Sequence, residues 1–166
     1  MKALIYAGLA LLTLGLQITV VPSIAIWGIR PNLVLVTLLA IALRWRDTFV
    51  FVYAAVLGVA LDSFSHGVLG VYGISFFGVA LAARLAGNAM YEDNLVSGVM
   101  AVFGLCILEG IVFTSIFRVL DHGVPWWNWV LARVLPGALY DALLAPLVFM
   151  GLMRLERWLA VQARER

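Results

Sequence analysis

Charged side chains are scarce in this sequence. Only 12% of its 166 residues are Asp, Glu, Lys or Arg, whereas soluble domains carry about 25%. Most of the remainder is apolar, with 64% hydrophobic residues and a mean hydropathy of +1.06. A soluble domain of this size cannot hide so much apolar surface from water. The composition therefore excludes a soluble domain and predicts an all-α, polytopic membrane protein.

Residues that commonly carry catalysis or bind metals are also few. The single cysteine, Cys106, lies in an apolar run, so neither an intramolecular disulfide nor a thiolate metal site is expected. The two histidines, His66 and His122, fall in predicted loops, and no metalloprotease, hydrolase or phosphate-loop motif occurs. The net charge of +2, without a dense basic run, argues against nucleic acid. We predict no enzymatic activity and no cofactor or metal.

Hydrophobic segments separated by short polar breaks dominate the chain. Because the first is longer than a signal-peptide core and lacks a cleavage site, we interpret it as an uncleaved span. The second and third segments are short and could form a re-entrant hairpin, but its tip would bury Arg44, Arg46 and Asp47 in lipid. We therefore predict one domain over residues 1–166, a compact bundle of six spans. These spans cover approximately residues 3–21, 31–43, 48–61, 69–85, 95–117 and 130–153.

Basic residues are unevenly distributed between the two sides of such a bundle. Positive charge prefers the cytoplasmic side, so both termini are expected in the cytoplasm. The inner flanks would hold Lys2, Arg44, Arg46, Arg84, Arg154, Arg157, Arg164 and Arg166, and the outer side Arg30, Arg118 and Arg133.

Three charged residues, Glu109, Arg133 and Asp141, are candidates for functional charges inside the membrane. At 1.5 Å per residue, Arg133 and Glu109 lie at neighbouring depths, which predicts an ion pair. The alternative is that Arg133 reaches outward alone and Glu109 is protonated or bound by a hydroxyl group. Asp141 lies deeper and requires a partner inside the bundle. Three such residues are few for an ion path.

The stretch "GVALDSFSHGVLG" gathers Asp62, Ser63, Ser65 and His66 between apolar runs. These groups are too close in sequence to build a hydrolytic triad. We interpret the stretch as a rigid turn in which Asp62 caps a helix end, with flanking glycines that allow a tight turn and close helix approach.

Three segments together resemble the rod shape-determining protein MreD family. They are "RPNLVLVTLLAIALRWRD", "GVALDSFSHGVLGVYGI" and "GALYDALLAPLVF". Asp141 stands where the family usually has Asn. On this resemblance, the partner-binding or structural residues are Pro31, Asn32, Gly58, Asp62, Gly67, Leu69 and Gly70. The residues predicted to be polar or structural within the membrane are Glu109, Arg133, Tyr140, Asp141 and Pro146.

The resemblance implies a non-catalytic scaffold in the bacterial inner membrane. Members of this family bind MreC within the elongation machinery, which joins MreB filaments, the RodA glycosyltransferase and a penicillin-binding transpeptidase. They support lateral peptidoglycan synthesis and cell shape.

The alternative is the substrate-binding subunit of an energy-coupling-factor vitamin transporter, which has a similar length and number of short spans. Its pocket would be lined by Asp62, His66, Glu109 and Arg133, and Ala3 with Ala7 has the spacing of its coupling face.

Overall fold

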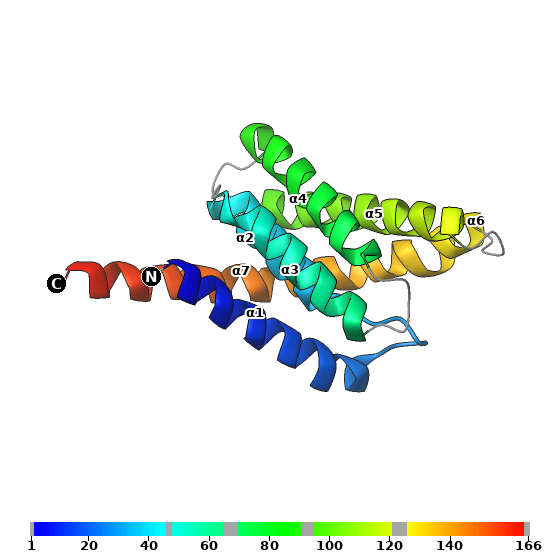
Figure 1. Cartoon of the computed structure of the whole chain (residues 1–166). Coiled ribbons are helices and arrows are strands. Elements are labelled where there is room, and N and C mark those ends of the chain that lie inside the picture. Colours follow the sequence, from blue (N-terminus) through cyan, green and yellow to red (C-terminus); the bar gives the residue numbers. More distant parts are fainter. Residues whose placement is uncertain (1, 46–47, 65–69, 91–94, 121–125, 165–166) are drawn as a thin grey trace.

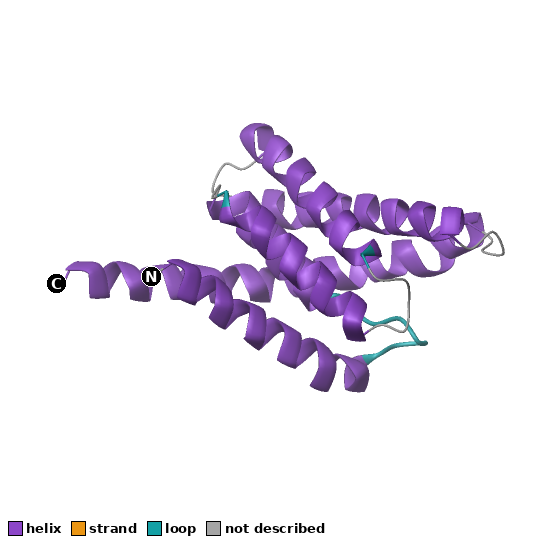
Figure 2. Cartoon of the chain, in the orientation of Figure 1, coloured by secondary structure: helices purple, strands orange, loops and turns teal. Residues whose placement is uncertain are grey.

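The computed structural model consists of helices joined by short loops in the part of the chain it describes, and this confirms the predicted all-α class (Figure 2). The only β pairing among these residues is an isolated bridge between Ile26 and Ile29. The predicted site residues Gly67 and Leu69, together with His66, lie outside the described residues. The description covers residues 2–45, 48–64, 70–90, 95–120 and 126–164.

Six helical rods follow the six predicted hydrophobic segments in order (Figure 1). The last rod is continuous but contains a five-residue π-helical stretch, η2. The elements are α1 (Lys2–Thr19), the 3₁₀ turn η1 (Val21–Ile24), α2 (Leu33–Trp45), α3 (Phe49–Phe64), α4 (Val71–Met90), α5 (Leu95–Leu120), α6 (Trp126–Trp129), η2 (Val130–Val134) and α7 (Leu135–Arg164).

The short helix α2 forms the centre of the bundle. All residues from Val34 to Leu43 are buried, and α2 contacts α1, α3, α4, α5 and α7. A helix that is apolar on every face is stable where other helices, rather than water, surround it. Since protein surrounds α2 on all sides, its short length does not have to match the thickness of a bilayer.

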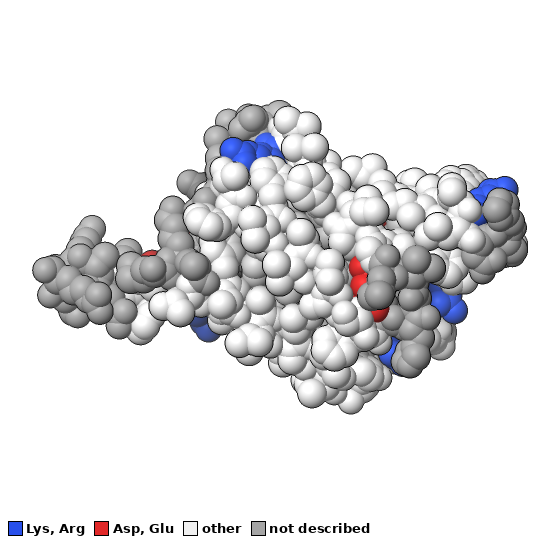
Figure 3. Space-filling model, in the orientation of Figure 1, with Lys and Arg blue, Asp and Glu red and all other residues white. Residues whose placement is uncertain are grey.

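The surrounding helices expose apolar side chains on their outer faces. Leu11, Val56 and Leu143 are each more than half exposed, although they lie in the middle of α1, α3 and α7. Figure 3 shows a broad uncharged surface, with the blue atoms of Lys and Arg near the ends of the molecule. Two helical stretches, Leu95–Leu120 and Trp126–Leu159, are long and apolar enough to cross a membrane. The other four rods are shorter apolar helices, so six spans remain a prediction.

The bundle has two distinct ends. The start of α1 and the end of α7 lie together at one end, here called the near end, and α2 and α4 begin at the opposite, far end (Figure 1). At the near end, the Arg44 guanidinium donates from Nε to both oxygens of Glu156, at 2.7 Å each, and Trp45 donates to the same carboxylate. Partial burial raises the pKa of Glu156, but the hydrogen bonds and charge of these partners outweigh it and hold the pKa below its usual value.

Helices α3 and α4 meet through a backbone contact. A Cβ atom added at Gly58 would lie 2.5 Å from the Cα atom of Gly73 and 2.7 Å from the carbonyl oxygen of Tyr72. Only a residue without a side chain fits this crossing. Close approach was predicted for Gly67 and Gly70; that prediction is wrong for Gly70, and the close approach occurs at Gly58 instead. Gly70 has no atom within 4 Å of its Cβ position.

Candidate functional site

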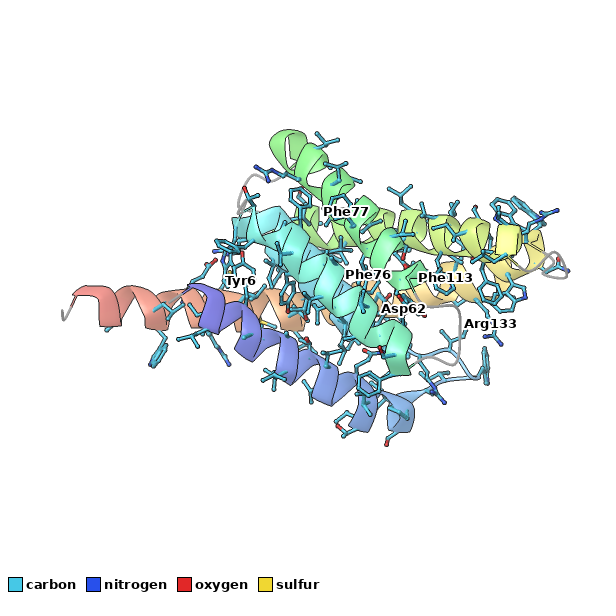
Figure 4. All side chains as sticks on the ribbon, viewed as in Figure 1. Tyr6, Asp62, Phe76, Phe77, Phe113 and Arg133 are labelled. Carbon is cyan, nitrogen blue, oxygen red and sulfur yellow. The ribbon has the colours of Figure 1, made fainter. Side chains whose placement is uncertain are left out.

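A buried carboxylate organises the turn between α3 and α4. Asp62, in the last turn of α3, is 2% exposed. Its Oδ2 atom accepts hydrogen bonds from the amides of Gly70 and Gly73, at 2.9 and 3.2 Å, and its Oδ1 atom accepts one from Tyr72 at 3.1 Å. Free amides at a helix start attract negative charge, so Asp62 caps α4 from the neighbouring helix. This confirms the predicted cap, and Figure 4 shows Asp62 between the two helices.

Gly70 has a conformational role in this turn. Its φ angle is +97°, a value that residues with side chains rarely adopt. The predicted freedom of glycine is therefore used at Gly70, whereas residues 65–69 of the predicted turn lie outside the described residues. We call Asp62, Gly70 and the exposed end of α3 at Ser63 and Phe64 the Asp62 corner.

A second buried carboxylate holds the start of α2. Asp141 on α7 is 6% exposed, and its Oδ1 atom accepts a hydrogen bond from the Asn32 amide at 2.6 Å. The Asn32 side chain caps its own helix by accepting from the Leu35 amide at 3.1 Å. Asp141 was predicted to require a partner inside the bundle, and that partner is the backbone amide of Asn32 at the start of α2. The same contact joins the first and third segments that resemble the MreD family, through two residues that are 109 positions apart in the sequence.

Two further side chains tie this region together. Gln17 on α1 donates to the carbonyl of Pro31 at 3.1 Å and accepts from the Leu33 amide at 2.8 Å. Tyr140 donates its hydroxyl to the carbonyl of Ile24 at 2.7 Å. Gln17 was not among the predicted site residues. It is the only amide side chain in the first apolar segment, which is the signal that would have found it.

Between these helices lies a cavity of about 510 Å³, open at the far end. Its charged lining consists of Arg30, Glu109, Arg133 and Asp141, from the loop before α2 and from α5, η2 and α7. The buried carboxylates are 7% exposed for Glu109 and 6% for Asp141, whereas both arginines are exposed. The cavity therefore has cationic groups near its opening and carboxylates in its interior.

The predicted ion pair between Glu109 and Arg133 is not formed. Glu109 accepts a hydrogen bond from the Ser75 hydroxyl at 3.0 Å, which is the hydroxyl-bound alternative raised above. The Arg133 guanidinium instead lies over the ring of Trp129, 4.9 Å from its centroid. A cation gains from the electron-rich face of an aromatic ring, which an exposed guanidinium reaches without leaving water. Both residues still line the same cavity.

The remaining predicted residues have structural positions. Pro146 lies inside α7 without ending the helix. Asp62 does not line the cavity, so of the three described residues proposed for the pocket of a vitamin-binding subunit, Glu109 and Arg133 come together and Asp62 does not. Within the described ranges, no three His, Cys, Asp or Glu side chains are grouped closely enough to hold a metal ion. The carboxylates of Asp62 and Asp141 bind backbone amides, and these hydrogen bonds order the starts of α4 and α2.

A family model described as rod shape-determining protein MreD matches residues 1–155. The chain belongs to the MreD family. The match includes the Asp62 corner, the Asn32–Asp141 contact and all the charged residues that line the cavity. Membership in the MreD family places the chain among membrane proteins with a role in rod shape determination, in a family not known for enzymatic activity. No curated protein and no solved structure matches the chain.

Proposed function

We propose that this MreD-family protein is a non-catalytic scaffold of the bacterial elongation complex that binds MreC and supports lateral peptidoglycan synthesis. The observation that carries the proposal is the set of three backbone amides bound by Asp62. This buried carboxylate fixes the start of α4 against the end of α3, and preorganised surfaces bind partners with a small loss of conformational entropy. Through MreC, the scaffold reaches RodA, the penicillin-binding transpeptidase and MreB.

The protein crosses the inner membrane six times, with both termini in the cytoplasm. This topology is supported by the near end, where α1 starts, α7 ends and Arg44, Arg154 and Arg157 are found. It is tested by cysteine labelling in a Cys106→Ala background. A cysteine at Arg157 should react only after the inner membrane is permeabilised, and one at Trp27, which is 97% exposed, should react from the periplasm. Labelling of both positions from one side would contradict the topology.

MreC contacts the Asp62 corner in this proposal. Phe64, the last residue of α3, is 59% exposed beside the buried Asp62 carboxylate. An exposed aromatic ring beside a fixed contact between two helices offers the apolar anchor that protein interfaces favour.

The test is capture of MreC by the full-length protein in membranes. Phe64→Ala should lower MreC capture at least fivefold and produce rounded cells. Val56→Ala on the same helix is the matched control, since Val56 is 58% exposed but farther from the corner. Both variants keep every hydrogen bond of Asp62, so their amounts in the membrane should equal that of the wild type. Normal capture by Phe64→Ala would refute this contact face.

A further inference from the structure

The cavity at the far end contains groups that the scaffold role does not use. Glu109 is 7% exposed and receives one hydrogen bond, from Ser75 to its Oε1 atom. Among the described residues, no Lys or Arg side chain forms an ion pair with Glu109, although the two arginines of the cavity lie on the same surface. A buried carboxylate is costly without a compensating charge or additional donors. The free Oε2 atom therefore marks a place for a cationic or hydrogen-bond-donating ligand group.

The two kinds of charge lie at different depths. Glu109 is 11 residues from the end of α5, and Arg133 is 7 residues from the start of α6. At 1.5 Å per residue these offsets are roughly 16 and 10 Å, so the carboxylate lies about 6 Å deeper. Asp141, eight residues beyond Arg133 on the same rod, lies deeper still. A ligand that satisfies both kinds of group has a cation at its inner end and an anion behind it.

Aromatic rings form one wall of the cavity and continue toward its opening. The ring of Phe113 is 4.5 Å from that of Tyr72 and 6.2 Å from that of Phe117, which is in turn 6.4 Å from Trp129. Rings of this kind are typical of the membrane–water boundary, where they contact both the apolar and the polar parts of lipids. They also attract an ammonium group by cation–π interaction. Figure 4 shows Phe113 and Arg133 at the same end of the bundle.

We propose that this cavity binds the headgroup of a phospholipid that carries a primary ammonium, of the phosphatidylethanolamine type. The ammonium contacts Glu109, with Asp141 nearby, and the phosphate contacts Arg30 and Arg133. The order of groups in such a lipid agrees with the order in the cavity. The amine is the terminal group and enters first, the phosphate follows, and the acyl chains remain outside in the bilayer.

Size and charge both discriminate among ligands. A volume of 510 Å³ corresponds to roughly 17 water molecules and falls in the usual range for small-molecule sites. An anionic lipid would satisfy the arginines but would face the two carboxylates, and an uncharged molecule would satisfy neither. The central carbon of the Arg133 guanidinium lies 4.9 Å from the centroid of the Trp129 ring, a contact that uses none of its N–H groups, so these groups remain available to a phosphate.

The experiment measures binding of short-chain lipids to the purified full-length protein. Native mass spectrometry counts the lipids retained, and intrinsic tryptophan fluorescence, to which Trp129 in the cavity wall contributes, reports occupancy. The wild type should bind dihexanoyl phosphatidylethanolamine at least tenfold more tightly than the phosphatidylglycerol analogue. Glu109→Gln, which keeps an acceptor for Ser75, and Arg133→Gln, at an exposed position, should each weaken ethanolamine binding at least tenfold. Arg118→Gln is the matched control, because Arg118 is an arginine near the far end that lines a different pocket, and it should change binding less than twofold.

Four results would overturn the proposal. The first is equal affinity for the two lipids, and the second is unchanged ethanolamine binding in Glu109→Gln. The third is tight binding of free phosphoethanolamine with no gain from the acyl chains, which would identify a soluble ligand. If MreC protects Trp129 and expels the lipid, a basic segment of that partner is the occupant instead. The lipid-binding proposal is independent of the scaffold function, because absence of lipid binding together with normal MreC capture would refute lipid binding alone.

Discussion

Replacing Gly58 with alanine tests whether the α3–α4 contact is as close as the structure shows. The new Cβ atom would lie 2.5 Å from Gly73 Cα and 2.6 Å from its amide nitrogen, whereas carbon atoms pack at about 3.5–4.0 Å. Because both obstructing atoms belong to the backbone, the helices must separate by roughly 1 Å. Overpacking of this kind costs about 1–3 kcal/mol, and the separation would also strain the Asp62 hydrogen bonds to α4.

The matched control is Gly73→Ala on the opposite side of the same contact. A Cβ atom at Gly73 would meet its nearest neighbour, a methyl group of Val59, at 3.5 Å, which is ordinary contact. Both substitutions remove a helical glycine and so gain about 1 kcal/mol of helix propensity. We therefore expect Gly73→Ala to be neutral or stabilising and Gly58→Ala to lower the unfolding temperature of the purified protein in lipid nanodiscs. Equal unfolding temperatures for the two variants would refute the backbone contact.

Three further predictions concern the helix ends, each measured by unfolding in nanodiscs. Asp141→Asn keeps an acceptor for the Asn32 amide and should lower the free energy of unfolding by less than about 1 kcal/mol. Asp141→Leu leaves that amide without an acceptor and should lower it by about 1–3 kcal/mol. Equal losses for the two variants would exclude the cap. Gly70→Ala should cost about 1–2 kcal/mol because of its φ of +97°, and an unchanged stability would contradict that conformation. Glu156→Gln should cost about 1 kcal/mol at pH 7 by weakening the Arg44 contact. Since folding lowers the pKa of Glu156, the stabilisation by its carboxylate is fully present above the unfolded pKa of about 4.3 and is lost as the pH falls through the lower pKa of the folded state. A destabilisation by Glu156→Gln that persisted at pH 3 would refute this assignment.

The general fold and the family could be predicted from local patterns. Apolar runs interrupted by charged or glycine-rich breaks correspond to helices in the same order, because hydrophobicity is a local property, although the last helix continues past residue 153 to Arg164. The role of Asp62 could also be predicted, since the amides that it caps follow only 8 to 11 residues later. The family resemblance rests on contiguous segments and is confirmed over residues 1–155.

Contacts between distant segments were decided only by the tertiary structure. Spacing along the helices put Glu109 and Arg133 at neighbouring depths but could not fix how each helix is rotated about its axis. That rotation directs Glu109 to Ser75 and Arg133 to Trp129. The partner of Asp141 is the amide of Asn32, 109 residues earlier in the sequence, and no local sequence pattern extends over such a separation. Composition and periodicity therefore determined the helices and their polar residues, whereas packing against the buried α2 determined which of these residues share a cavity and which hold a helix end.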